Sequence, residues 1–460
     1  MVSYTQTDLL CACCQRPITS DSDVVYCEIC HQPHHRNCWQ EHGGCSLSDY
    51  HTHLHPDETS SPSDTMVDLP SVSSSLPSTT IPQISNVPSH QQSSSRTRVW
   101  VGIGLIIGLI AAAFVARSLG VSHQTILLMG VIVTALGFDF VNGMNDSGNA
   151  IATVISTRAL PPLYALIMAA VLNFVGAVLM EGVAKNIAGK IIDVHAVPLN
   201  TITPLMILCG LLGAIAWSYL MARIGLPISM SHALIGGLVG VLLLARIPLN
   251  LSYIGEICLW MILAPILGFT LGWALMLGIM WIFRNVAPHK MNRQFRYWQL
   301  LSSGLMAFSH GANDAQKAMG IITLALVSCN FIHTVHGAVP HIPIWVKLAC
   351  ASVIALGTAL GGRKVIGTLG HKIFKLTTVH GFAAEAVASG TIQLATMLHV
   401  PISTTHVISS SILGVGSSKR LSAVRWGVAG NIVSAWIFTI PTCGAVGALL
   451  YGLVRLLGIS

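Results

Sequence analysis

Apolar positions divide the chain into two regions of different character. Residues 1–98 are polar and rich in cysteine, histidine, serine and proline, whereas residues 99–457 are almost continuously hydrophobic. A bilayer core about 30 Å thick is crossed by roughly 20 apolar residues in a helix, so the second region has room for ten or more spans, with loops and broken helices. The pattern predicts an all-α polytopic membrane protein with a small polar domain before it.

Composition supports the membrane interpretation. Hydrophobic residues make up 53% of the chain and charged residues only 9%, where a soluble globular protein has about 25% charged residues. The net charge of +7 does not indicate nucleic acid, because lysine and arginine lie mostly at the ends of apolar segments, as the positive-inside rule expects. We expect a multi-pass protein of the cell membrane, embedded in lipid, without nucleic acid. The spans hold no nucleophile-and-base constellation, so we do not expect an enzyme.

Two motifs occur twice in the membrane region, in the same order. NGMND at residues 142–146 recurs as HGAND at 310–314, which is 168 residues later, and PISMSH at 227–232 recurs as PISTTH at 401–406, 174 residues later. Two different motifs repeated at nearly one spacing predict two related halves of a transporter.

A basic segment separates these halves and should be cytoplasmic. We predict repeat 1 over residues 124–283, a cytoplasmic loop over 284–298 and repeat 2 over 299–460. The basic residues of the loop are Arg284, Lys290, Arg293 and Arg296.

The repeated motifs carry complementary chemistry. Gly143 and Gly311 permit a break in a span, and the Asn-Asp pair after each glycine offers oxygens that suit a hard cation such as sodium; alternatively each carboxylate carries a proton. In the other motif, Pro227 and Pro401 fit the first turn of a helix, and serine or threonine follows. A helix N-terminus with free N–H groups binds anions, so one motif predicts a cation site and the other an oxyanion site near the middle of the membrane.

Three segments resemble the signatures of the PiT family of inorganic phosphate transporters. They are GFDFVNGMNDSGNAIATVISTRAL (137–160), FSHGANDAQKAMGIITLAL (308–326) and HVPISTTHVISSSILG (399–414), and the resemblance covers roughly residues 125–457. It implies an inverted-repeat fold with broken helices or re-entrant hairpins. It also implies secondary active symport of inorganic phosphate with Na+ or H+ by alternating access.

The resemblance also implies site residues. Many family members have histidine where this chain has Asn145, and the first hairpin reads Ser-Met-Ser, so the coupling ion stays open. Glu385 matches a membrane-embedded glutamate tied to transport, and its counterpart in the first half is Asn173. The implied ion and phosphate ligands are Asn145, Asp146, Asn149, Asn313 and Asp314, with the hydroxyls of Ser229, Ser231, Ser403, Thr404 and Thr405.

Two charged residues break the repeat. Asp139 lacks an acidic counterpart in the second half, so a functional role and a simple hydrogen bond to a neighbouring helix are about equally expected. Gln316 and Lys317 stand where the first half has Gly148 and Asn149. Lys317 could pair with a carboxylate or attract the anion, and the sequence does not choose between these roles.

Residues 1–55 have the composition of a metal-binding domain, with seven of the twelve cysteines. The spacing is that of a two-zinc cross-brace, and disulfides are disfavoured because seven is odd and the cysteines come in pairs. The pattern resembles prokaryotic RING-finger-like domains. The resemblance implies one Zn2+ on Cys11, Cys14, His35 and Cys38 and another on Cys27, Cys30 and Cys45, with the eighth ligand open among His42, His51 and His53.

A tether and an extra span follow this domain. Residues 56–98 are rich in serine and proline and read as a disordered linker, and residues 99–118 as an added transmembrane helix. By the resemblance the transporter core begins outside, so the added helix puts the zinc domain in the cytoplasm, where thiolates stay reduced. A cytoplasmic protein partner for the domain and a homodimer of the transporter are left open.

Two other functions compete with phosphate symport. A sulfate permease of the same superfamily would use the same helix-end chemistry, since both anions are tetrahedral. A membrane-anchored zinc-finger signalling protein without transport would not need intramembrane carboxylates, and their presence in both halves argues against it.

Overall fold

The computed structural model describes residues 11, 24–27, 33–41, 118, 120–194, 196–334 and 341–458. The chain forms two compact units, residues 1–89 and 90–460. The predicted added span, 99–118, lies outside the described residues except for Ser118, and the linker 56–98 lies wholly outside them.

The described residues of the N-terminal unit include a hairpin and a short helix. Strand β1 (Val24–Tyr26) pairs antiparallel with β2 (Pro33–His35), and α1 (Arg36–Glu41) follows directly. Of the predicted zinc ligands, Cys11 and Cys27 are buried and Cys38 is half-buried, while His35 lies in β2. The others lie outside the described residues: Cys14, Cys30 and Cys45, and the candidates His42, His51 and His53.

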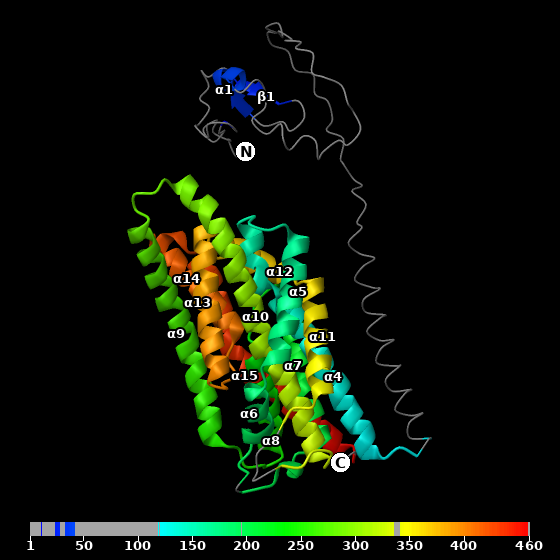
Figure 1. Cartoon of the computed structure of the whole chain (residues 1–460). Helices are drawn as coiled ribbons and strands as arrows, with labels where there is room; N and C mark the ends of the chain where they lie inside the picture. Colours follow the sequence, from blue (N-terminus) through cyan, green and yellow to red (C-terminus); the bar gives the residue numbers. More distant parts are fainter. Residues whose placement is uncertain are drawn as a thin grey trace, which may run out of the picture. The chain divides into compact units, whose positions relative to one another are not determined.

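The membrane unit is a bundle of long helices (Figure 1). Five of the described helices are long and apolar enough to cross a bilayer, and a sixth span results if α11 is joined to the helical segment after it, which is bent by 62°. The five are α4 (His123–Ser156), α5 (Pro162–Leu179), α7 (Pro204–Ile224), α9 (Leu251–Ile282) and α15 (Trp426–Leu456).

The sequence predicts room for ten or more spans, but fewer of the described helices qualify by length and composition. The remaining helices are shorter or more polar. Helix α10 has 41 residues but begins with the basic segment. These helices are α6 (Gly182–Lys190), α8 (Met230–Leu244), α10 (Pro288–Ser328), α11 (Ile344–Leu360), α12 (Arg363–Gly367), α13 (Thr378–Met397) and α14 (Thr404–Ser417), with a π-helical turn over Thr368–Lys372.

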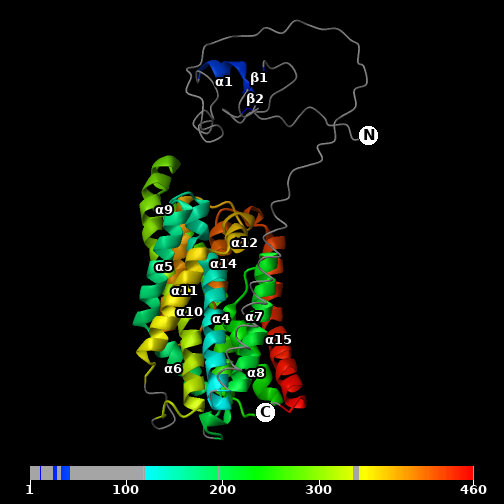
Figure 2. The same ribbon diagram turned by 90° about the vertical axis from the view of Figure 1, so that its right-hand side faces the viewer.

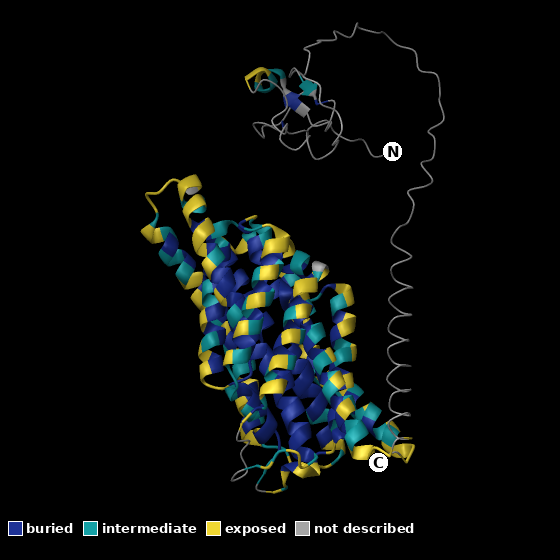
Figure 3. Ribbon diagram, turned by 45° about the vertical axis from the view of Figure 1, so that its right-hand side comes forward, coloured by how far each residue is buried: buried dark blue, intermediate teal, exposed yellow. Residues whose placement is uncertain are grey.

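Helix α5 turns large apolar side chains outward and small or polar ones inward. On α5, Leu163 and Ile167 are exposed, whereas Ala165, Ala169 and Asn173 are buried. Buried residues therefore gather inside the bundle and exposed ones on its outer surface (Figure 3). This arrangement suits lipid, because small residues let helices approach closely while lipid tails solvate large apolar side chains.

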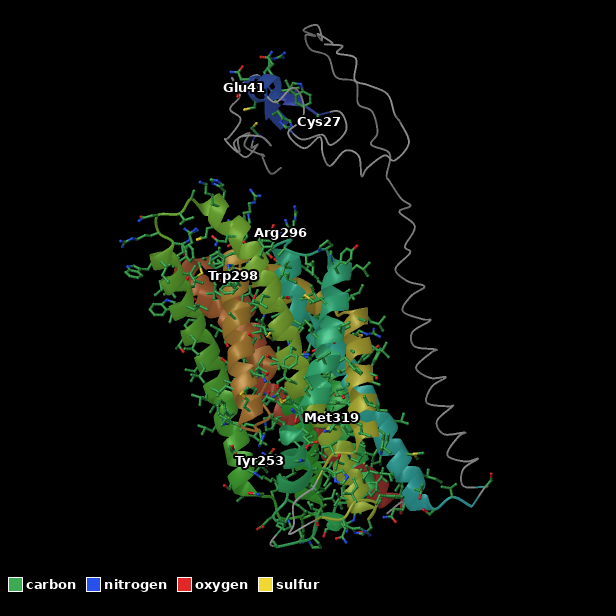
Figure 4. The ribbon with its side chains drawn as sticks, in the orientation of Figure 1. Cys27, Glu41, Tyr253, Arg296, Trp298 and Met319 are labelled. Carbon is green, nitrogen blue, oxygen red and sulfur yellow. The ribbon has the colours of Figure 1, made fainter. Side chains whose placement is uncertain are left out.

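The helices pair reciprocally between the two halves. Helix α4 packs on α11 as α10 packs on α5, and α8 packs on α15 as α14 packs on α9. Helices α7, α8 and α15 form one side of the bundle (Figure 2). Helix α4 starts at the end where the C-terminus lies, whereas α10 starts at the opposite end (Figure 1). Along α10, Arg296 and Trp298 lie near its start and Met319 far along it (Figure 4).

The predicted breaks at Gly143 and Gly311 do not occur. Helix α4 runs unbroken through the first motif and α10 through the second. A Cβ on Gly143 would collide with the carbonyl oxygen of Ile354 on α11, and one on Gly311 with that of Asn173 on α5. The glycines are needed because neighbouring helices touch their backbones, not because the helix stops there.

The predicted loop 284–298 is also mostly helical. Helix α10 already begins at Pro288, which occupies its first turn, so the connection between α9 and α10 spans only residues 283–287. Proline is favoured there because its missing N–H would be unpaired anyway and its φ suits a helix.

Substitution of Gly311 tests the close helix contact. We expect Gly311→Ala to lower the free energy of unfolding by about 1–3 kcal/mol through overpacking, measured as the thermal midpoint in detergent. Gly137→Ala on α4 is the control, because nothing lies within 4 Å of a Cβ there and alanine favours the helix. Equal midpoints for the two variants would contradict the packing role.

Candidate functional site

Two aspartates, one from each half, meet at the centre of the site. Asp146 on α4 and Asp314 on α10 lie with His310 so that one ligand atom from each falls within 4.8 Å of the others. His310 Nε2 is 3.7 Å from Asp146 Oδ2 and 3.5 Å from Asp314 Oδ2. All three are buried, with exposed fractions of 3% or less. We call these three residues the acidic cluster.

Hydroxyls from the start of α14 reach the same carboxylates. Thr404 Oγ1 donates to Asp146 Oδ2 at 3.4 Å and to Asp314 Oδ2 at 3.3 Å, and Thr405 Oγ1 donates to Asp146 Oδ1 at 3.3 Å. Asn149 Nδ2 donates to Thr405 Oγ1 at 2.9 Å. The structure therefore brings the second serine-threonine motif onto the carboxylates of both acidic motifs.

Two serines of the hairpins cap the N-termini of the helices that follow them. Ser229 and Ser403 are the N-caps of α8 and α14, and each accepts a hydrogen bond at 3.2 Å from the backbone N–H three residues later. Ser231 Oγ donates to the carbonyl of Ile402 at 2.8 Å, which ties one hairpin to the other.

This geometry corrects the predicted place of the prolines. Pro227 and Pro401 lie two residues before the caps, not in the first turn. The cap is a serine because its side chain can satisfy a free N–H of the first turn, which proline cannot do.

His310 presents an unprotonated nitrogen to the carboxylates in its neutral form. Its Nδ1 lies 2.8 Å from Asn173 Oδ1, an acceptor, so Nδ1 carries the proton. Nε2 has no hydrogen-bond partner among the described residues. A lone pair facing two carboxylates is unfavourable unless Nε2 is also protonated or a cation lies between the three groups.

Sequence reasoning did not select His310 as a site residue, although a signal was present. His310 opens the repeated motif and stands where the first half has Asn142. Asn142 contacts the cluster too, since its Nδ2 donates to Asp314 Oδ2 at 3.4 Å.

Lys317 takes the first of the two roles left open for it. Its Nζ lies 2.6 Å from Asp314 Oδ1, one turn away on α10, and both side chains are 1% exposed. An ammonium buried to this degree requires such a partner.

Asn313 of the repeated motif is hydrogen-bonded to residues outside the acidic cluster. Asn313 Nδ2 donates to Thr396 Oγ1 at 2.9 Å and to the carbonyl of Val400 at 3.4 Å, just before the second hairpin. Asn145 is buried beside Gly362. Neither side chain contacts a cluster carboxylate among the described residues.

Glu385 forms a second, separate polar group. It is fully buried on α13 and accepts hydrogen bonds from the hydroxyl of Thr153 on α4 and, at 2.5 Å, from Ser302 Oγ on α10. Thr153 lies seven residues beyond Asp146, which is about 10 Å along a helix. The predicted counterpart of Glu385 in the first half, Asn173, lies on α5, which exchanges with α11 and not with α13 in the reciprocal pairing, and it contacts His310 instead.

A cavity of about 480 Å³ lies between the start of α6 and the end of α13. One of its wall residues, Thr396, also holds Asn313, so the cavity borders the second hairpin. It is lined in part by Glu181, Gly182, Lys185, Asn186, Thr396 and His399.

Glu181, one of the residues that line this cavity, forms two ion pairs. Glu181 pairs with Lys185 at 2.6 Å and with Lys347 at 2.5 Å. Burial alone would raise the pKa of Glu181, but the two ammonium groups outweigh it and lower the pKa below its usual value. Asn186 Nδ2 donates to the carbonyl of His399 at 2.9 Å and so links the two halves.

Comparison with known proteins places the chain in a family. Residues 142–447 match the family described as the Phosphate transporter family. The chain belongs to this family. It is 44% identical over 334 residues to a probable low-affinity inorganic phosphate transporter of Bacillus subtilis, covering 72% of this chain and 98% of the relative. A Rhizobium meliloti protein of the same description is 43% identical over 329 residues, covering 71% and 96%.

A solved structure described as "The sodium-dependent phosphate transporter" is also similar. Its TM-score is 0.65 at 26% identity, with 72% of this chain and 99% of that chain covered. The predicted phosphate transporter family and the absence of an enzymatic role are thus confirmed. Neither the sulfate permease nor the signalling protein is favoured by these comparisons.

Thr405 offers a test of the hydroxyl contacts. We expect Thr405→Val to lower kcat/KM for phosphate uptake at least about tenfold, since a hydrogen bond to a charged group contributes about 1.5–3 kcal/mol. Thr405→Ser, which keeps the hydroxyl, is the control and should stay near wild type. Initial uptake rates in proteoliposomes give the result, and a fully active valine variant would contradict the role.

Proposed function

We propose that this protein carries inorganic phosphate across the cell membrane together with Na+ or H+ by alternating access. The observation behind the proposal is the convergence of Asp146, His310 and Asp314 from both halves, with the α14 hydroxyls of Thr404 and Thr405 upon them. The cluster would hold the cation, and the adjoining helix ends would hold the anion.

Several oxygens near the cluster favour a cation there. The side-chain carbonyl oxygens of Asn142 and Asn149 are buried and accept no hydrogen bond from the described part of the chain. Hard cations take carboxylate and amide oxygens as ligands, and two buried carboxylates need positive charge nearby. The likeness to a sodium-dependent transporter supports sodium, and a proton on the cluster is the other candidate.

The anion site in this proposal is formed by the N-termini of α8 and α14. Their first N–H groups lack partners within the helix and attract a phosphate. The hydroxyls of Ser231, Thr404 and Thr405, with the caps Ser229 and Ser403, line these ends. Asn313 and Glu385 would act outside this first layer of contacts, since they contact other groups in this state, and Asn145 is proposed as a ligand by its place in the motif.

Reciprocal helix pairing supports an inverted-repeat mechanism. The pairs α4 with α11 and α10 with α5 exchange roles between the halves, and α4 and α10 start at opposite ends of the bundle. Two such repeats can rock against each other around a site at their interface. We place repeat 1 at 124–283 and repeat 2 at 299–460.

Uptake of radiolabelled phosphate into proteoliposomes tests the proposal. Under a sodium gradient or a proton gradient, wild type should accumulate phosphate, and excess sulfate should not compete. Asp146→Asn and Asp314→Asn should each lose at least about tenfold of the rate, because a buried ion pair contact of this kind contributes about 2–5 kcal/mol.

Glu256→Gln on α9 is the matched control, since it removes an exposed carboxylate and should leave the rate unchanged. Unchanged uptake in both aspartate variants would refute the site, and strong inhibition by sulfate would refute its selectivity.

For the N-terminal region we propose a cytoplasmic zinc domain over residues 1–55, joined by the linker 56–98 and the added span 99–118. Burial of Cys11 and Cys27 beside a β-hairpin supports this proposal, because structural zinc sites are enclosed by their ligands.

Metal content provides the test. Purified protein should contain about two zinc ions per chain by mass spectrometry of the elements, and Cys27→Ser should lower that number. Cys258→Ser, at an exposed membrane cysteine, should leave it unchanged. A protein free of zinc but with disulfides at these cysteines would overturn the zinc assignment.

A further inference from the structure

One acidic residue in the bundle has no counter-charge in contact with it among the described residues. Asp139 on α4 is fully buried, and neither of its oxygens is paired with a nitrogen or oxygen donor in this part of the chain. From α11 the thiol of Cys350 faces it, and a thiol is only a weak donor. A buried carboxylate in this condition is costly, so its place invites a cation.

Asp139 lies on α4 about two turns before Asp146, a member of the acidic cluster. Asp139, Asn142 and Asp146 are spaced by three and four residues and therefore share one face of α4. Asn142 Nδ2 donates to Asp314 Oδ2 at 3.4 Å, while its Oδ1 lacks a donor within the described residues. Asp314 and Lys317 on α10 are both close enough to act electrostatically on Asp139.

Among the described residues, Lys317 is a positive charge that acts on Asp139. Its ammonium is bonded to Asp314 Oδ1 at 2.6 Å, at the end of a flexible four-carbon stem. It is therefore an internal cation held on one carboxylate, with a second carboxylate within electrostatic range.

Neither Asp139 nor Lys317 has a charged residue at the corresponding position of the other half. At the 168-residue spacing of the first motif, Asp139 corresponds to Ala307 and Lys317 corresponds to Asn149. Asn149 binds Thr405 at 2.9 Å as a neutral amide. The first half thus has an additional acid and the second half an additional base, at positions that do not correspond but that both act on or contact Asp314.

We propose that the Lys317 ammonium is a tethered cation that moves between Asp314 and Asp139 during transport. When the coupling cation enters the acidic cluster, it replaces the ammonium on Asp314, and the ammonium moves to Asp139. Lys317 thereby supplies a positive charge inside the site. If a neutral asparagine stood at this position, as Asn149 does in the first half, an external cation would have to supply that charge. This inference rests on the proposed cation-coupled phosphate transport and deepens it.

The test compares Asp139→Asn, Lys317→Asn and the double variant in proteoliposomes. Phosphate uptake is measured against cation concentration, with sodium and protons varied separately, and charge moved per phosphate is taken from the reversal potential. Asp139→Asn should raise the half-saturating cation concentration about tenfold or more, with little change in KM for phosphate at saturating cation. Phosphate transport by Lys317→Asn should need one further cation. The uptake rate of this variant should therefore rise more steeply with cation concentration than that of wild type.

The double variant decides between this exchange and a structural role. If Asp139 acts by receiving the ammonium, the double variant should behave like Lys317→Asn alone, whereas independent structural defects would add. Asp139→Asn preserves shape and removes a buried charge, so it should fold, and its thermal midpoint is measured alongside. Unchanged cation dependence in Asp139→Asn, or additive effects in the double variant, would overturn the inference. Failure of wild type to carry phosphate would instead overturn the proposed function.

Discussion

The structure depends on keeping two aspartates, Asp146 and Asp314, together inside a low-dielectric bundle. Carboxylates this close repel each other and lose their hydration, so every neighbouring group must compensate. Lys317 supplies a full charge to one of them, and Thr404 and Thr405 supply hydroxyl donors. In the proposed mechanism the remaining electrostatic deficit attracts a cation, and the bound cation in turn favours the anion.

Close helix packing makes that arrangement rigid. Gly143 and Gly311, each three residues before a cluster aspartate, let a neighbouring backbone carbonyl approach directly. A larger side chain would push α11 or α5 outward and move the carboxylates apart. The same contact places Asn173 on α5 beside Gly311, and from there its side chain orients His310. Packing and electrostatics are thus set by the same few residues.

The two halves are alike in their backbone but differ in charge. Glu385 accepts hydrogen bonds from hydroxyls of α4 and α10, whereas Asn173 contacts the His310 ring of the acidic cluster. Only the second hairpin offers threonines to the carboxylates, while Ser231 of the first hairpin bonds across to Ile402. In the proposed mechanism, similar helix pairing with different side chains lets both halves move alike while the cation and the anion meet different partners.

Sequence alone was sufficient for the membrane class and the family, because hydropathy and repeated motifs are written along the chain. It also selected Asp146, Asp314, Thr404 and Thr405, which the structure brings into contact. The predicted helix breaks at Gly143 and Gly311 and the predicted first-turn positions of Pro227 and Pro401 were wrong. A glycine that permits a break and one that permits close packing look identical in sequence. Sequence alone could not assign Lys317 or find the role of His310. Those depend on which helices lie side by side, and contacts between residues more than a hundred positions apart are fixed only by the tertiary structure.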